Sequence, residues 1–226
     1  RILHFLAGVA GLDARLEGLI EPAPPALALQ RQSHHPQRSH TPAPGSDREA
    51  GRAARLLDAS DPPVIYLSGA DPTTRMVTAC GTATRLDRPL FLLRASDLPA
   101  DPVGRHGLAR LWEREARLTG GILLVELDGG TGVPGGPGEL AACGAFLAEG
   151  SFPALVTADS PVPFPGRRQV VRLTIELPPA SEREKAWREA LGGRGARLNG
   201  FVPALSAQFQ LPPALRDGRL KRPVTT

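Results

Sequence analysis

One stretch decides the fold, VIYLSGADPTTRM at residues 64–76. It starts with four apolar or aromatic residues between Asp61-Pro62-Pro63 and Gly69, which predicts a strand buried on both faces, as in a parallel sheet. The residues after Gly69 predict a short polar loop and then a helix that continues through Gly81 or beyond. Phosphate-binding loops lie between a buried strand and a helix amino terminus, because free amides and the helix dipole attract anions.

The loop departs from the phosphate-binding consensus G-x-x-x-x-G-K-[ST]. Gly69 keeps the first glycine, and Thr74 stands where the second glycine belongs. Arg75 replaces the lysine, and Met76 replaces the hydroxyl residue that holds magnesium. Arginine is bulkier and forked, so it is not a simple substitute for a lysine that reaches through the loop. We interpret the stretch as a P-loop that has lost its function, with Gly69, Thr73, Thr74 and Arg75 as its remaining candidate nucleotide contacts.

Composition limits the classes of function. The 226 residues suffice for one large domain, and the formal net charge of +4 is weak and dispersed. Nucleic-acid binding usually needs a clustered basic stripe with aromatic platforms, which argues against a nucleic-acid partner here. Cys80 and Cys143 form no C-x-x-C pair, which predicts free, buried thiols in a cytoplasmic protein. No apolar run approaches the roughly 20 residues that span a bilayer, so we expect no membrane contact.

The chain opens without Met, and its only Met is Met76, so we expect a piece of a longer protein. Residues 1–20 show helical spacing of apolar groups and are interpreted as two short helices at the tail of a preceding domain. Residues 21–46 are rich in Pro, His and Ser, which predicts a disordered linker. Its histidines, His34, His35 and His40, lack acidic or cysteine partners, so we expect no metal site.

Strands and helices alternate through the following core, residues 47–177. This order predicts an α/β fold with a mainly parallel, five-stranded sheet between two helix layers. The predicted strands are 64–68, 89–93, 122–128, 152–157 and 169–175, with helices at 47–59, from the loop to 81 or beyond, 101–119 and up to 148. Residues 178–217 turn helical again and predict a small appended subdomain, followed by the start of another linker at 218–226.

The decayed P-loop, the order of the strands and the helical tail after Leu177 together resemble the AAA+ ATPase fold, with the tail as its lid. More narrowly, the chain resembles the degenerate first ATPase domain of bacterial AAA family proteins. Those proteins carry an N-terminal winged-helix region and a second, intact ATPase domain. On this resemblance, residues 1–20 would follow the winged-helix region, and residues 47–217 would form the degenerate core and lid.

The resemblance assigns candidate roles to individual residues. Glu126 takes the position of the metal-binding acid, Leu127 that of the catalytic Glu, and Asp128 comes one residue late. Leucine cannot activate water, so Glu126 and Asp128 are weak catalytic candidates. Asp159 falls at the sensor-one position, where its charge would repel a γ-phosphate. Three arginines complete the set: Arg167 and Arg168 as possible trans-acting fingers, and Arg216 as a possible sensor-two residue.

We therefore expect a degenerate nucleotide-binding domain with a structural or regulatory role beside an active ATPase domain of the same chain. ATP and magnesium are expected for an oligomeric, ATP-driven remodelling protein as a whole, and whether this part is itself an enzyme stays open. Two alternatives also stay open. The first is a weak ATP-binding or ATP-hydrolysing domain using Arg75 and Asp128, and the second is a nucleic-acid-binding module.

Overall fold

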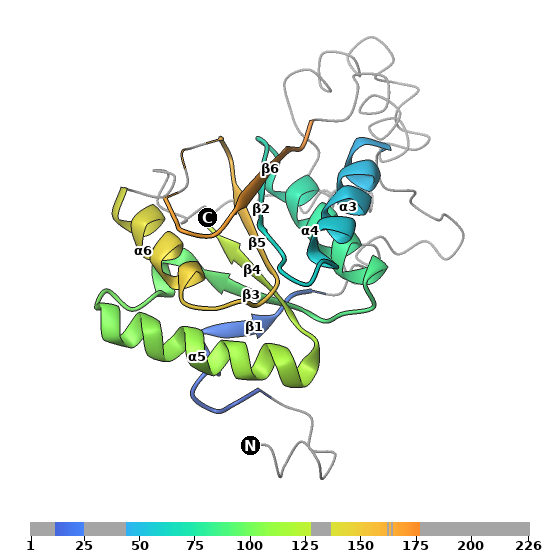
Figure 1. The fold of residues 1–226 in the computed structure, drawn as a ribbon. Coiled ribbons are helices and arrows are strands. Elements are labelled where there is room, and N and C mark those ends of the chain that lie inside the picture. Colours follow the sequence, from blue (N-terminus) through green and yellow to red (C-terminus); the bar gives the residue numbers. More distant parts are fainter. Residues whose placement is uncertain (1–11, 25–43, 128–136, 162, 164, 177–226) are drawn as a thin grey trace, which may run out of the picture.

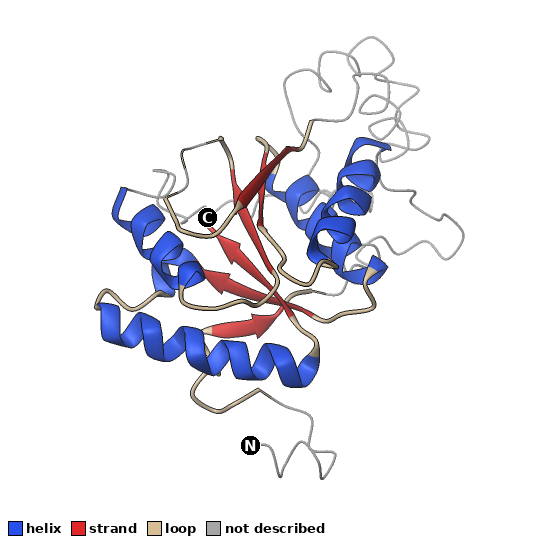
Figure 2. Cartoon of the chain, viewed as in Figure 1, coloured by secondary structure: helices blue, strands red, loops and turns tan. Residues whose placement is uncertain are grey.

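The computed structural model describes residues 12–24, 44–127, 137–161, 163 and 165–176. Figures 1 and 2 show their helices and strands. The strands are β1 (Ile20–Pro22), β2 (Val64–Ser68), β3 (Leu90–Arg94), β4 (Ile122–Glu126), β5 (Ala154–Ala158) and β6 (Val170–Thr174). The helices are α3 (Pro44–Leu57), α4 (Pro72–Arg85), the short 3-10 helix η1 (Ala95–Asp97), α5 (Pro102–Thr119) and α6 (Pro137–Ala148).

The strands form one six-stranded sheet in the order β1-β3-β4-β5-β2-β6. All neighbouring pairs are parallel except β1 with β3. The predicted α/β class with a mainly parallel sheet is therefore confirmed. β2, the strand of the deciding stretch, lies between β5 and β6, and all five of its residues are buried. The five parallel strands end at the same side of the sheet, which we call the carboxyl edge, and begin at the opposite side, the amino edge.

Helices cover both faces of the sheet and make three layers (Figure 1). α5 and α6 pack on one face, where Trp112 and Phe146 meet Tyr66 of β2 in one apolar cluster. α3 and α4 pack on the other face, in a cluster that contains Ile65 and Leu67. Successive side chains of a strand point to opposite faces, so β2 supplies both clusters. An unbroken apolar run is therefore what this position of the sheet requires.

The ends of α5 follow local rules that the sequence shows. The carboxylate of Asp101 accepts a hydrogen bond of 2.7 Å from the amide of Gly104, and Pro102 occupies the first turn. Gly120 ends the helix with a φ of 70°, a left-handed conformation that favours glycine. The predicted helix at 101–119 thus corresponds to α5 at Pro102–Thr119.

The amino-terminal segment differs from its prediction. Residues 14–19 form turns instead of helix, and β1 then adds a sixth strand, with Ile20 opposite Leu93 of β3. Leu16 and Ile20 are fully buried against the α5 face of the sheet. Residues 21 and 22, assigned to a linker by the sequence, lie in this strand, and α3 begins already at Pro44. The apolar groups with helical spacing cover the otherwise open edge of β3, and that burial outweighs the local preference for helix.

Charged groups hold the same segment on α5. Asp13 accepts hydrogen bonds from Arg15, at 3.1 Å from its Nε, and from Arg114 of α5. The bonds from Arg15, and then that from Arg114, hold the pKa of Asp13 well below its usual range. In the described part of the chain, residues 12–24 therefore pack as part of the domain, with β1 as an edge strand of the sheet.

Cys80 and Cys143 are both free and buried, as predicted. Burial raises the pKa of the Cys80 thiol to about 11 and that of Cys143 to about 12, which makes both poor nucleophiles. Within the described ranges, none of the helices combines the length and apolar character needed to cross a bilayer.

If β1 belongs to the core, Ile20→Ala should destabilise the chain by about 2–4 kcal/mol, because it leaves a cavity at a fully buried position. Glu21→Ala, at the exposed neighbouring position of the same strand, is the matched control and should change stability by less than about 0.5 kcal/mol. Urea unfolding followed by circular dichroism measures both. Equal stability of the two variants would contradict this assignment of β1.

Candidate functional site

The predicted P-loop lies at the carboxyl edge, but it is not an open loop. β2 ends at Ser68 and α4 begins at Pro72, so only residues 69–71 connect them. In the P-loop consensus, the residues between Gly69 and Arg75 would wrap a phosphate with their amides. Here residues 72–74 already belong to the first turn of α4. The connection between β2 and α4 is therefore shorter than the loop of the consensus.

Asp71 uses the amides that remain at the start of α4. Its carboxylate accepts hydrogen bonds from the amides of Thr73, at 3.3 Å, and Thr74, at 3.0 Å. The hydroxyl of Thr74 also donates to it. A helix start attracts anions through these free amides, and Asp71 is an anion supplied by the chain itself.

Arg75 is the buried centre of the candidate site, with 2% of its surface exposed. Its guanidinium donates a hydrogen bond back to the carbonyl oxygen of Gly69. Burial lowers the pKa of Arg75, while the nearby charges of Asp159, Asp71 and Glu126 favour its charged form. The guanidinium stays protonated at neutral pH, since an arginine in a protein does not give up its charge.

Close packing explains the glycine at position 69. A Cβ on Gly69 would lie 2.5 Å from the carbonyl oxygen of Ile175. Ile175 follows β6, and its amide donates a 2.6 Å hydrogen bond to the carbonyl of Ser68. The residues after β6 thus press on the connection between β2 and α4. This contact alone requires a residue without a side chain.

The other predicted positions gather around Arg75. Glu126 ends β4, and Asp159 follows β5, where its carboxylate accepts a 2.9 Å hydrogen bond from Ser160. The structure thus brings Glu126 and Asp159 close enough to Arg75 for their charges to act on it, together with Asp71. Leu127, at the position of the catalytic Glu, is buried with 2% exposure.

Asp128 and Arg216 lie outside the described residues, and so do His34, His35 and His40. In the described ranges, no group of three or more His, Cys, Asp or Glu side chains is arranged to hold a metal ion.

The two predicted finger arginines lie at the amino edge and differ from each other. Arg168 donates to the carbonyl of Pro62, at 2.8 Å, and to that of Leu147, at 3.4 Å. Its guanidinium also lies 5.9 Å from the ring centroid of Phe152. Arg167 is exposed. Arg168 thus links the residues that precede β2 and β5 to the end of α6. Arg167, in contrast, faces solvent.

Sequence reasoning missed the part played by Asp71, although the signal was present. An acidic residue before a proline marks a helix cap and first turn, and the same pattern at Asp101-Pro102 correctly predicted the start of α5. At Asp71-Pro72 the same cap pattern is overlooked when these residues are interpreted as part of a P-loop. Read as a cap, Asp71 predicts that α4 starts before Thr74.

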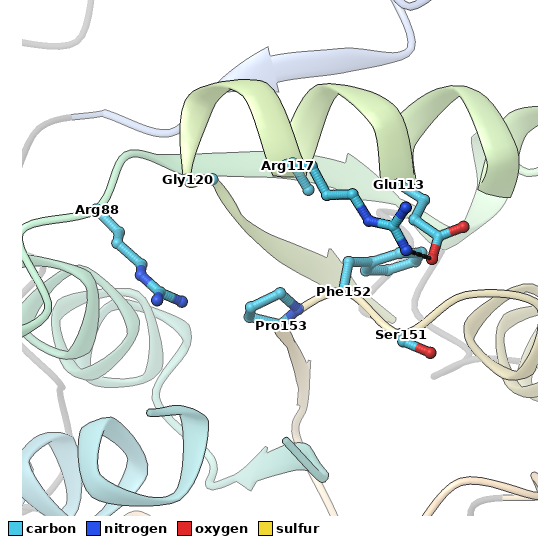
Figure 3. A pocket seen from close by; sticks show the side chains of 9 residues that line it. Arg88, Glu113, Arg117, Gly120, Ser151, Phe152 and Pro153 are labelled. Atoms are coloured by element: carbon cyan, nitrogen blue, oxygen red, sulfur yellow. Dashed lines mark hydrogen bonds and ion pairs between the residues drawn. The ribbon is translucent and has the colours of Figure 1, made fainter. Parts of the chain in front are cut away.

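A separate cavity of about 250 Å³ opens at the amino edge (Figure 3). It is lined by the last turns of α5 and by the residues that lead into β3, β4 and β5. None of the predicted site residues lines it. The predicted site and this cavity therefore lie on opposite edges of the sheet.

The family model of the contractile injection system ATPase helical domain matches residues 179–215. No curated protein matches the chain. The structure of Trip13 from Rhizobiales is 15% identical and aligns with 93% of this chain and 99% of its own, with a TM-score of 0.47. Trip13 in the HORMA:CdnC:Trip13 complex of E. coli MS115-1 is 16% identical over 72% of this chain and 69% of its own, with a TM-score of 0.45.

The ATPase helical-domain match falls inside residues 178–217, the range predicted as the lid. Preceded by a mainly parallel α/β sheet, it supports an AAA+ ATPase-related fold, as the sequence analysis predicted. The boundaries of the domains remain predictions.

Replacing Arg75 tests the buried cluster. Arg75→Met removes the cation from three nearby carboxylates and from the Gly69 carbonyl, and we expect a loss of ~3 kcal/mol in the free energy of unfolding. The exposed Arg167→Met is the control and should stay within about 0.5 kcal/mol of the unmodified chain. Urea unfolding distinguishes the two, and a neutral or stabilising effect of Arg75→Met would show that the cluster is not a structural element.

Arg168 and Arg167 make a second matched pair. Arg168→Ala breaks two hydrogen bonds to carbonyls and the contact with Phe152, for an expected cost of about 2 kcal/mol. Arg167→Ala should leave the melting temperature unchanged, because this side chain is exposed. Thermal unfolding of both variants measures the difference. A larger effect at Arg167 would reverse the assignment.

Proposed function

We propose that this chain is part of an ATPase-family protein in which the described domain does not hydrolyse ATP. Its role is structural or regulatory, beside an active ATPase domain of the same protein. One observation carries the proposal: the connection between β2 and α4 has three residues, Asp71 accepts from amides of the first turn of α4, and Arg75 donates to the carbonyl of Gly69. The amides of Thr73 and Thr74 already donate to Asp71, so they are not available to a nucleotide phosphate.

Charge supports the same conclusion. A bound triphosphate would approach Asp71, Glu126 and Asp159, all of which lie near Arg75. Arg75 is the only cation in that cluster within the described residues, and its guanidinium already donates to Gly69. Like charges at short range repel strongly in a partly buried site, so the cluster disfavours a phosphate chain.

The catalytic parts are also missing at the positions where the resemblance places them. Phosphoryl transfer to water needs a positioned base or water-orienting group and a metal ion that bridges the phosphates. Leu127 is a buried aliphatic side chain at the position of the base. Met76 stands at the position of the hydroxyl that would help to hold magnesium. Restoring a single residue would therefore not restore hydrolysis.

The ATPase helical-domain match suggests the wider setting. We infer that the parent protein is an ATP-driven remodelling protein associated with a contractile injection system, and that ATP and magnesium act at another of its domains. The partners would then be the active ATPase domain, further copies of the same protein, and a protein substrate. The described domain would support the assembly in which the active domain works.

Titration calorimetry of the chain with Mg-ATP tests the loss of nucleotide binding, with Arg75→Ala as the comparison. We expect no binding and no turnover for either protein, even at high protein concentration, because Asp71 occupies the helix start. Binding by the unmodified chain that disappears in Arg75→Ala would mean that the connection still holds phosphate, and the proposal would be wrong.

The regulatory role needs the full-length protein. Deleting residues 12–176 from it should lower ATP turnover or disturb assembly, as seen by sizing chromatography. The milder Arg75→Met variant of the full-length protein controls for the size of the deletion and should act in the same direction. Unaltered turnover, assembly and partner binding in both variants would contradict the role.

A further inference from the structure

The cavity at the amino edge is built from parts that the proposed function does not use. Its walls come from Arg88 before β3, the last turns of α5 with Glu113 and Arg117, the Gly120-Gly121 pair before β4, and residues 151–153 before β5. Phe152, a residue with 3% exposure, forms part of the apolar wall with Ala116 and Pro153. A Cβ on Gly121 would lie 2.8 Å from the ring of Phe91. The close approach of this ring therefore favours a residue without a side chain at position 121.

The charges at the cavity are unequal. Arg117 donates to one oxygen of Glu113 at 2.8 Å, and Arg110 lies 3.5 Å from the other oxygen. Both oxygens of Glu113 are therefore engaged. Arg88 extends toward Pro153 (Figure 3), and within the described part of the chain its side chain makes no hydrogen bond or ion pair. The lining therefore holds two guanidinium groups, those of Arg88 and Arg117, against the one carboxylate of Glu113, which gives the opening a net positive charge.

The geometry points to a binding site for an acidic side chain of a protein partner, held by Arg88. A guanidinium recognises a carboxylate through two parallel hydrogen bonds. Of the two arginines that line the cavity, Arg117 is paired with Glu113, and the side chain of Arg88 makes no hydrogen bond or ion pair within the described part of the chain. The methylene groups of the incoming side chain would pack on Phe152, Pro153 and Ala116. This inference does not depend on the relation to ATPases.

Size and charge distribution select a protein side chain over other anions. Small-molecule and cofactor sites are clefts of about 300–1,000 Å³, so a cavity of about 250 Å³ suits one side chain better than a nucleotide. A nucleic-acid backbone needs a continuous line of cations. Here Glu113 lies between Arg110 and Arg117 and interrupts such a line.

An NMR titration of the ¹⁵N-labelled 226-residue chain tests the site with defined probes. The acidic probe is N-acetylglutamate N-methylamide, and the neutral control is N-acetylglutamine N-methylamide. We expect the acidic probe to give saturable shifts at the amides of Gly120, Gly121 and Ser151. The Arg88→Gln variant should bind it about tenfold more weakly, because a charge-assisted pair is lost.

Two further variants keep the result unambiguous. Arg55→Gln removes an exposed cation from α3, on the other face of the sheet, and should bind like the unmodified chain. Arg88→Lys keeps the positive charge but loses the planar guanidinium that makes two parallel hydrogen bonds, and it should bind the acidic probe with intermediate affinity. The proposal is overturned if the neutral probe shifts the same amides equally, if Arg88→Gln binds unchanged, or if no saturable shift occurs. Displacement of the acidic probe by a lower concentration of inorganic phosphate would also overturn it, in favour of a phosphate ligand.

Discussion

The hydrogen bond from the guanidinium of Arg75 to the carbonyl of Gly69 is the interaction on which the carboxyl edge depends. Through this bond a side chain of α4 contacts the connection that precedes the helix. The bond also holds a buried positive charge near Asp71, Glu126 and Asp159. A buried charge is costly unless it is compensated, so the buried guanidinium of Arg75 depends on these nearby negative charges. Under the proposed function, the arrangement that stabilises the edge is the same one that would exclude a phosphate.

This relation accounts for several departures from the P-loop consensus together. A lysine that reaches a phosphate must leave the loop in front of it open, whereas Arg75 is buried behind a connection of three residues. With Asp71 as the cap, α4 starts early, and the second glycine of a P-loop has no function at Thr74. Gly69 persists for a separate reason, since Ile175 crosses it closely. What resembles decay in the sequence is a consistent structure in its own right.

The opposite edge shows that the fold uses its arginines in different ways. Arg168 is engaged with carbonyls from the entry to β2 and from the end of α6, and so it fixes the amino edge from inside. Arg88 and Arg117 lie at the cavity nearby, where Arg117 is neutralised by Glu113 and Arg88 is not. Within the described residues, the positive charge thus divides into a few structural arginines, such as Arg75 and Arg168, and a larger number of exposed ones.

Most of the sheet could be predicted from sequence because its signals are local. The strands of the parallel sheet are apolar runs bounded by Gly, Pro and Asp, and their predicted positions agree with β2 to β6 within a few residues. β1 could not be predicted, since a three-residue strand exists only through its pairing with β3. The direction of Arg75 and the partners of Arg168 were equally out of reach, because they depend on groups brought together by folding, up to 106 positions apart in the sequence.

The central claim is that the carboxyl edge is filled by the chain's own side chains and has no place for a nucleotide. A crystal structure grown with magnesium and an excess of a non-hydrolysable ATP analogue tests it most directly. The account predicts that Arg75 still donates to Gly69, that Asp71 still caps α4, and that no nucleotide is bound there. Phosphate oxygens on the amides of Thr73 and Thr74, with Arg75 turned away from Gly69, would contradict it.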